Sequence, residues 1–275
     1  MVNQTLAAGA DNAIMTCVII VQARLGSSRL PGKILEEIAG KSALLWCLDR
    51  LARVASVDKV VCAVPEGAAD DPVAEAAQAA GYWVSRGSEH DVLARYAKAA
   101  RETEATTVMR VTSDCPFIDP VICGQVLALL GTADVDYACN NMPPRFPHGL
   151  DCDAFPAALL YEAEKCAHDP YEREHVTPWL RRHRRLSKAC LRGPGGGLER
   201  LRWTLDHAAD LEFFRACANA FGEGAEFASA AELAALCLRR PDLVVINADV
   251  IDQARLSDET RAPLQTAPMA LTHAA

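Results

Sequence analysis

Residues 16–33 read TCVIIVQARLGSSRLPGK, a run of β-branched residues followed at once by a polar loop that contains two glycines. The continuous apolar run over 16–21 is typical of a strand that is buried on both faces, as in a parallel sheet covered by helices. In an open parallel sheet, ligands bind beyond the carboxyl ends of the strands. The loop over 22–33 leaves such an end, so we predict that it binds a ligand.

Strands and helices continue to alternate through the first half of the chain. We expect further strands over 59–64, 83–85 and 107–111, separated by helices over about 43–54, 72–80 and 91–102. Strands that alternate with helices of this length form βαβ units. The predicted fold class is therefore α/β, with a single doubly wound and mostly parallel sheet.

The pattern changes after about residue 138. The stretch PPRFPHG over 143–149 is rich in turn residues, so we predict a polar excursion over about 140–190 in place of another βαβ unit. A last strand is expected over 201–206. Asp206 or a neighbour would then cap a helix through 211–218.

Bulk composition limits the classes of function. The chain of 275 residues has a formal net charge of −8, which argues against a nucleic-acid-binding surface. The basic run over 181–185 is expected to be a solvated helix end. No apolar run is long enough to span a bilayer, so no membrane partner is expected. Eleven Cys without a C-x-x-C pair indicate reduced, buried thiols in a cytoplasmic protein.

The chain is expected to hold one folded domain between two loose ends. We predict a disordered leader over 1–15, a domain over 16–256 that includes the excursion, and a flexible tail over 257–275.

The loop after the first strand has the chemistry of a phosphate site. Gly26 permits close approach of a phosphate to the backbone, and the amide groups around Ser27 and Ser28 could form an anion-binding nest. Arg24, Arg29 and Lys33 supply positive charge for a triphosphate. The alternative is a surface loop that is basic without binding anything.

Two aspartates follow predicted strands. Asp114 comes directly after the strand over 107–111, and Asp206 ends the strand expected over 201–206. Magnesium is usually held by one or two carboxylates together with phosphate oxygens, so both residues are candidate Mg²⁺ ligands. Each one taken alone is more often a helix cap.

Six stretches, in this order and spacing, resemble a known family. They are VQARLGSSRLPGK (21–33), SRGSEHDVLARY (85–96), VMRVTSDCPFIDP (108–120), FPHGLDCDAF (146–155), DPYEREHVTPWLRRH (169–183) and LRWTLDHAADL (201–211). The sequence resembles the cytidylyltransferases that activate acidic sugars, such as 3-deoxy-manno-octulosonate and N-acylneuraminate cytidylyltransferases. It is similar in particular to the branch of spore-coat polysaccharide biosynthesis nucleotidyltransferases.

The resemblance implies a Rossmann-like sheet of the nucleotide-diphospho-sugar transferase type and a Mg²⁺-dependent reaction. It implies that Arg29 and Lys33 hold the donor phosphates and that Asp114 and Asp206 bind the metal. The residues that it places around the nucleotide are Ala23, Arg24, Gly26, Ser27, Ser28, Arg86 and Asp91. CTP as donor follows from the family and not from any residue seen here.

The acceptor site is expected in the excursion, because its polar clusters differ from the flanking apolar helices. The candidates are Arg145, His148, Asp151, Arg173, Glu174 and His175. An acidic acceptor would want Arg145 or Arg173 for its carboxylate. A structural role is the alternative for either histidine.

These observations predict a nucleotidyltransferase that transfers CMP from CTP to a sugar, with an acidic sugar implied by the resemblance, and releases pyrophosphate. A glycosyltransferase is one rival, but it would typically show an Asp-x-Asp pair where this chain has Ser113-Asp114-Cys115. A regulatory nucleotide-binding protein is the other, but it would have lost Lys33, Asp114 or Asp206. The identity of the sugar and the oligomeric state, a homodimer included, are left open.

Overall fold

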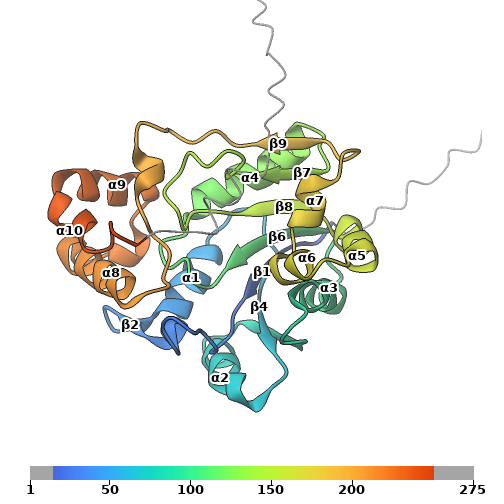
Figure 1. Cartoon of the computed structure of the whole chain (residues 1–275), viewed down its shortest axis with the longest axis horizontal. Helices are drawn as coiled ribbons and strands as arrows, with labels where there is room; N and C mark the ends of the chain where they lie inside the picture. Colours follow the sequence, from blue (N-terminus) through green and yellow to red (C-terminus); the bar gives the residue numbers. More distant parts are fainter. Residues whose placement is uncertain (1–14, 251–275) are drawn as a thin grey trace, which may run out of the picture.

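The structure is a computed structural model that describes residues 15–250. The predicted tail over 257–275 and nearly all of the predicted leader therefore lie outside the described residues. The main elements follow the chain in this order (Figure 1): β1 (Cys17–Gln22), α1 (Ala43–Leu51), β4 (Lys59–Pro65), α2 (Asp71–Ala79), β5 (Trp83–Gly87), α3 (Val92–Glu102), β6 (Thr107–Thr112), α4 (Pro120–Thr132), β7 (Tyr137–Cys139), β8 (Asp153–Pro156), α5 (Ala157–Cys166), α6 (Pro170–His175), α7 (Pro178–Arg182), β9 (Lys188–Cys190), α8 (Ala208–Phe221), α9 (Ala230–Arg239) and α10 (Pro241–Val245).

One sheet of seven strands in the order β5-β4-β1-β6-β8-β7-β9 forms the centre of the molecule. Strand β8 runs antiparallel to both of its neighbours, and all other pairs are parallel. The predicted α/β class with a mostly parallel, doubly wound sheet is confirmed. A separate two-stranded ribbon, β2 (Glu37–Ile38) and β3 (Lys41–Ser42), follows the loop after β1.

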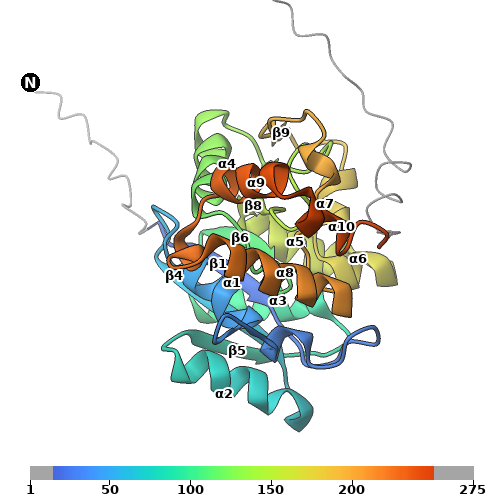
Figure 2. The same cartoon turned by 90° about the vertical axis from the view of Figure 1, so that its left-hand side faces the viewer.

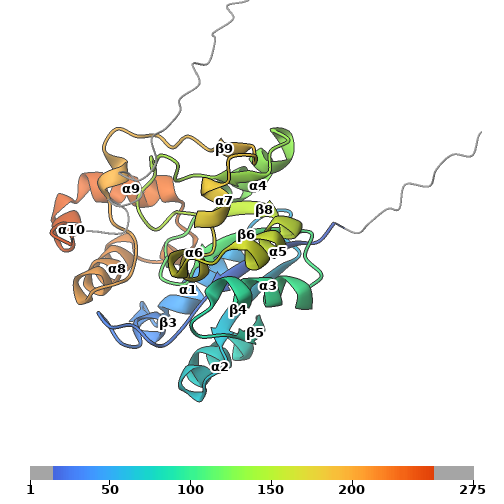
Figure 3. The same cartoon turned by 45° about the vertical axis from the view of Figure 1, so that its right-hand side comes forward.

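Helices cover both faces of the sheet, so β1 is buried on both sides as its sequence predicts. Ile19 and Val21 pack in one core with α1, α2 and α4, whereas Val18 and Ile20 pack in another with α3 and α5. In Figure 3, α3 and α5 lie together on the side of the sheet that comes forward.

A third core joins the C-terminal helices to the rest of the molecule. Residues of α8, α9 and α10 pack with Trp46 of α1, Phe117 and Trp203. Phe117 makes edge-to-face ring contacts with both tryptophans. Figure 2 shows these three helices as a group in front of the sheet.

Two expectations about the second half of the chain are wrong. Residues 201–206 form no strand; only an isolated bridge pairs Arg202 with His148. The excursion also contributes β8 and β9, which extend the sheet together with β7. These strands are only three or four residues long, too short to show a hydrophobic period in the sequence.

The basic run over 181–185 is only partly a solvated helix end. Arg184 and Arg185 are exposed, but Arg181 reaches inward from α7 to the buried Asp153 at 2.7 Å. Eight of the eleven cysteines are buried, as expected for thiols that pack as small apolar groups. Within residues 15–250, no helix has the length and apolar character needed to cross a membrane.

Candidate active site

The site lies at the topological switch point of the sheet, between β1 and β6. The chain passes from β1 outward to β4 on one side, while β6 returns on the other side as the parallel neighbour of β1. Gln22 and Thr112 end these two strands and are paired in register. The loop after β1 and the residues after β6 therefore leave the same edge of the sheet at the switch point, where ligands bind in folds of this kind.

The loop after β1 folds back on itself. Gly32 adopts a left-handed conformation (φ 73°), and its backbone N–H donates to the carbonyl of Leu25 at 3.1 Å. A side chain at this φ would be strained, so glycine suits the turn. The turn delivers Lys33 to the start of a short 3-10 helix, η1 (Lys33–Leu35), with its side chain directed inward and only 12% exposed.

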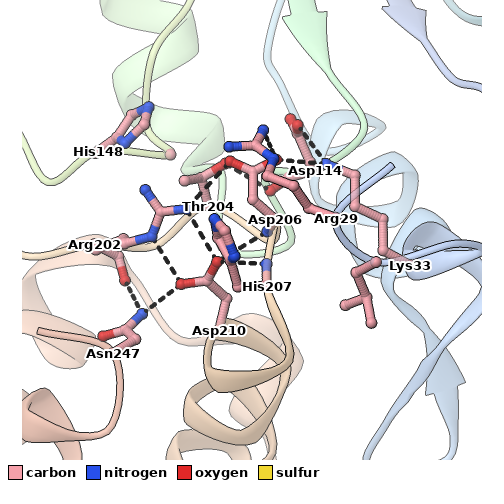
Figure 4. Close-up of polar contacts among 12 residues, drawn as sticks. Arg29, Lys33, Asp114, His148, Arg202, Thr204, Asp206, His207, Asp210 and Asn247 are labelled. Carbon is pink, nitrogen blue, oxygen red and sulfur yellow. Dashed lines mark hydrogen bonds and ion pairs between the residues drawn. The ribbon is translucent and has the colours of Figure 1, made fainter. Parts of the chain in front are cut away.

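Three side chains from distant parts of the chain meet at this edge (Figure 4). The Lys33 ammonium lies 3.0 Å from Oδ2 of Asp114 and 2.8 Å from Oδ1 of Asp206. The same Oδ1 of Asp206 also forms an ion pair with NH2 of Arg29 at 3.0 Å. The structure thus brings together all four residues that the sequence proposed for catalysis.

Asp206 reaches this place without belonging to a strand. Leu205 N donates to the carbonyl of Asp114 at 2.8 Å, and Trp203 N donates to the carbonyl of His148 at 2.6 Å. Gly149 makes the close approach of these segments feasible, because a Cβ there would lie 2.0 Å from the carbonyl oxygen of Trp203. The carboxylate of Asp206 is therefore positioned by backbone contacts between distant segments and not by membership of a sheet.

The electrostatics favour charged groups at this edge. Burial opposes ionisation of Asp114, but the Lys33 ammonium and the Thr112 hydroxyl hold the pKa of Asp114 at about 2. Burial alone would lower the pKa of Lys33. The two carboxylates outweigh the effect of burial, so the pKa of Lys33 is raised above its ordinary value. At neutral pH the site therefore contains the Lys33 cation paired with the Asp114 anion.

The carboxylates fit a magnesium ion that shares them with phosphate oxygens. Asp114 and Asp206 both bind one cationic group, the Lys33 ammonium, so their oxygens converge on a common point. Among the described residues there is no cluster of three or more His, Cys, Asp or Glu that could hold a metal alone. Two carboxylates completed by phosphate are the usual ligand set of Mg²⁺ at a nucleotide site.

The remaining residues predicted to bind the nucleotide flank the same edge. Ala23 is buried and donates its N–H to the carbonyl of Ala63 at 3.0 Å. Arg24, Gly26 and Ser28 are exposed on the loop, and Ser27 Oγ accepts from Leu30 N at 3.4 Å. The tip of the loop thus presents its backbone and Arg24 to solvent, where a ligand could reach them.

Arg86 and Asp91 border the segment between β5 and α3. Arg86 forms an ion pair with Asp71. Asp91 caps α3, since its Oδ1 accepts from Ala94 N at 2.9 Å, and its other oxygen accepts from Arg173 Nε at 3.1 Å.

The two segments predicted to bind the acceptor lie against different parts of the molecule. His148 N bonds to the carbonyl of Leu201 at 2.9 Å, and His148 Nε2 lies 3.9 Å from Asp151 Oδ2. The exposed Arg145 lies beside Gly195. His148 and Asp114 both lie against the segment 203–205, since Trp203 N donates to the carbonyl of His148 and Leu205 N donates to the carbonyl of Asp114.

Helix α6, which carries the second segment, packs on α3. The Arg173 guanidinium donates to Asp91 through Nε and NH2 and to the carbonyl of Glu164 through NH1 at 2.6 Å. Glu174 is exposed, and the His175 ring lies against that of Tyr171, tilted by 53° with the ring centroids 4.4 Å apart. The predicted contact of these three residues with the acceptor stays a prediction.

Sequence reasoning missed the residues that support Asp206. Arg202 and Asp210 are buried beside it, and Asn247 contacts both of them. Asp210 stands three residues after His207, at the N3 position of a capping box, and this spacing was a usable local signal. Asn247 lies 37 residues beyond Asp210 and has no local signal.

The fold and the site together are those of an α/β protein with a basic loop after β1 and two carboxylates at the same edge of the sheet. The cytidylyltransferase family model matches residues 18–218. The chain is 30% identical over 233 residues to the spore coat polysaccharide biosynthesis protein SpsF of Bacillus subtilis, which covers 82% of this chain and 95% of that protein. It is 31% identical over 172 residues to the 3-deoxy-manno-octulosonate cytidylyltransferase of Tolumonas auensis (61% of this chain, 65% of that one).

A solved structure of a cytidylyltransferase from Leptospira borgpetersenii superposes with a TM-score of 0.79 at 29% identity, covering 84% of this chain and 97% of that one. The chain belongs to the cytidylyltransferase family.

Proposed function

We propose that this protein transfers CMP from CTP to a hydroxyl group of an acidic sugar and releases pyrophosphate. The observation that carries the proposal is the convergence of Lys33, Asp114 and Asp206 at the end of β1 and β6. Transfer from a triphosphate needs cations that stabilise the leaving pyrophosphate and a metal ion that neutralises phosphate charge. This edge has a cation in Lys33 and two carboxylates that could hold a metal ion. Membership of the family supports the cytidine donor. The names of the relatives, which refer to a polysaccharide and to an octulosonate, support the sugar acceptor.

In the proposed reaction the sugar hydroxyl attacks the α-phosphorus as the bond to the β-phosphate oxygen breaks. Such a transfer depends mainly on positioning and on stabilisation of charge. Arg29 is 55% exposed and free to follow the phosphates, whereas Lys33 is anchored in the site. We assign both to the pyrophosphate that leaves. Bound between Asp114 and Asp206, Mg²⁺ would neutralise phosphate charge and polarise the α-phosphate.

We place the acceptor against the wall formed by residues 145–151. This wall contacts residues 201–203 through the backbone of His148, in the segment that leads to Asp206, and Arg145 is an exposed cation on it. A carboxylate of the sugar would find a bidentate partner in an arginine of this kind.

The test is a pyrophosphate-release screen of the four nucleoside triphosphates against acidic and neutral sugars. We expect turnover with CTP and an acidic sugar, abolished by excess chelator. Asp114→Asn should reduce turnover by about 100-fold or more, because it removes charge stabilisation at the reacting phosphate. Asp134→Asn is the matched control, since Asp134 is exposed in a left-handed turn (φ 48°) that Asn also tolerates.

Full activity of Asp114→Asn, or activity that persists in excess chelator, would contradict the metal assignment. Turnover with a neutral sugar alone would overturn the acidic acceptor, and turnover with another triphosphate would overturn CTP.

A further inference from the structure

Asp210, in the first turn of α8, is a buried carboxylate with an unusually full set of donors. Its side chain is 0% exposed. It accepts from Nε and NH2 of Arg202 at 2.8 and 3.0 Å, from the backbone N–H groups of Asp206 and His207 at 2.9 Å each, and from Nδ2 of Asn247 at 3.0 Å. Figure 4 shows these groups surrounding Asp210 directly below Asp206. Asp210 thus fixes the backbone on both sides of the Asp206 carbonyl.

Arg202 connects this buried carboxylate to the site. The NH2 group that bonds to Asp210 also lies 3.1 Å from Oδ2 of Asp206. Oδ1 of Asp206 is left to face Lys33 at 2.8 Å and Arg29 at 3.0 Å. One guanidinium therefore holds one oxygen of Asp206, so that the other points at the phosphate loop.

We propose that Asp210 is a positioning residue for Asp206, acting through Arg202 and through the backbone of residues 206–207. It determines which oxygen of Asp206 faces the phosphate loop and the metal. The inference rests on the role that the proposed function gives to Asp206. Carboxylates that bind metals are themselves oriented by hydrogen bonds, and loss of such a partner costs about 10- to 100-fold in metal affinity or activity.

A helix cap is the other role open to Asp210, because it forms a capping box with His207 at the start of α8. Helix α9 begins with the same device. There Ser229 caps the helix, and Glu232 accepts from Ser229 N at 2.8 Å and from Ser229 Oγ at 2.7 Å. Glu232 is exposed and contacts none of the site residues named here, so Glu232→Gln is a matched control for the capping role.

The experiment compares Asp210→Asn with Glu232→Gln in the full chain. Binding of Mn²⁺ alone is measured by electron paramagnetic resonance, next to kcat and KM for CTP and the thermal midpoint. We expect Asp210→Asn to weaken Mn²⁺ binding about 10-fold and to lower kcat about 10- to 100-fold, with KM for CTP changed less than about threefold. Glu232→Gln should leave Mn²⁺ binding and kcat at the wild-type level.

Arg202→Lys is the second variant, in case Asp210→Asn does not fold. Lysine keeps the charge but lacks the planar fork that contacts both carboxylates, so we expect the same loss of Mn²⁺ affinity. If Asp210→Asn folds and keeps the wild-type Mn²⁺ affinity and kcat, and only its thermal midpoint is lower, Asp210 is a helix cap and the inference is overturned. If the wild type binds Mn²⁺ but turns over no triphosphate, the proposed function fails, and the Mn²⁺ comparison still decides the role of Asp210.

Discussion

At the scale of single residues, the site is organised around one lysine that contacts two carboxylates. Lys33 is nearly buried, and its ammonium has both Asp114 and Asp206 within 3.0 Å. A buried cation is stable only where it is paired in this way. Phosphate oxygens of a donor can replace carboxylate oxygens as partners of the same group. Lys33 is thus placed to exchange a carboxylate contact for a contact with a bound triphosphate.

We expect Lys33→Ala to weaken binding of CTP about 10- to 100-fold and binding of CMP much less. A hydrogen bond to a charged group contributes about 1.5–3 kcal/mol, and in the proposed assignment only a triphosphate has the outer phosphates that contact Lys33. Isothermal titration calorimetry with both nucleotides measures the difference. Lys41→Ala is the matched control, because Lys41 also bridges two carboxylates, those of Asp49 and Glu226, outside the phosphate loop. Equal losses for CTP and CMP would contradict the assignment of Lys33 to the outer phosphates.

At the scale of elements, the segment between β5 and α3 is joined to the excursion through α3 and α6. Asp91 caps α3, and Arg173 of α6 donates to the same carboxylate. Arg173 is 23% exposed and also bonds to the carbonyl of Glu164 at the end of α5. The guanidinium therefore holds three helices together beside the segment that the sequence assigns to the nucleoside.

We expect Arg173→Ala to lower the free energy of unfolding by about 2 kcal/mol, since it removes charge-assisted hydrogen bonds from a half-buried site. For a domain of this size the thermal midpoint should fall by roughly 4–8 °C. His148→Ala should instead raise KM for the sugar about 10-fold with donor affinity unchanged, because His148 lies on the proposed acceptor wall, against Leu201 and Trp203. Calorimetric unfolding measures the thermal midpoint of Arg173→Ala, and steady-state kinetics measure the KM of His148→Ala for the sugar. An Arg173→Ala protein with a wild-type midpoint and a raised KM for the sugar would place Arg173 in the acceptor site.

At the scale of the whole molecule, the sequence predicts the parts of the fold that have local signals. The first strand, its loop and the strand before Asp114 were predictable, because long apolar runs and turn residues mark them. The position of Asp206 was predicted for the wrong reason. Its segment is not a strand, and it reaches Asp114 through backbone contacts such as Leu205 N to the carbonyl of Asp114. Contacts between segments that far apart leave no periodic pattern in a single sequence.

The same limit applies to a buried ionic network that spans the sheet. Asp153 of β8 is 1% exposed and lies between Arg110 of β6 at 3.3 Å and Arg181 of α7 at 2.7 Å. The hydroxyl of Tyr137 on β7 donates to the same carboxylate. The network joins β6, which the sequence predicts, to two short strands and a helix that composition and periodicity did not resolve.

We expect this network to make stability depend on pH. Burial opposes ionisation of Asp153, but Arg181 and Arg110 outweigh it and hold the pKa of Asp153 below its ordinary value. A lowered folded pKa adds stability that is complete above the unfolded pKa of about 3.9 and is lost as pH falls through the folded pKa. Asp153→Asn should therefore cost about 3 kcal/mol at pH 7, because it leaves two partly buried arginines without their anion.

The difference in unfolding free energy between wild type and Asp153→Asn should shrink as pH falls below about 4, since the carboxylate of the unfolded wild-type chain then takes up a proton while that of the folded protein stays ionised until a lower pH. Urea unfolding of both proteins from pH 7 to pH 3 measures this difference. Asp242→Asn is the control: Asp242 pairs with Arg240 in an exposed ion pair, and exposed pairs contribute little, so its midpoint should equal that of the wild type. A cost of Asp153→Asn that stays constant or grows toward low pH would show that shape and hydrogen bonding, and not the charge of Asp153, hold this half of the sheet together.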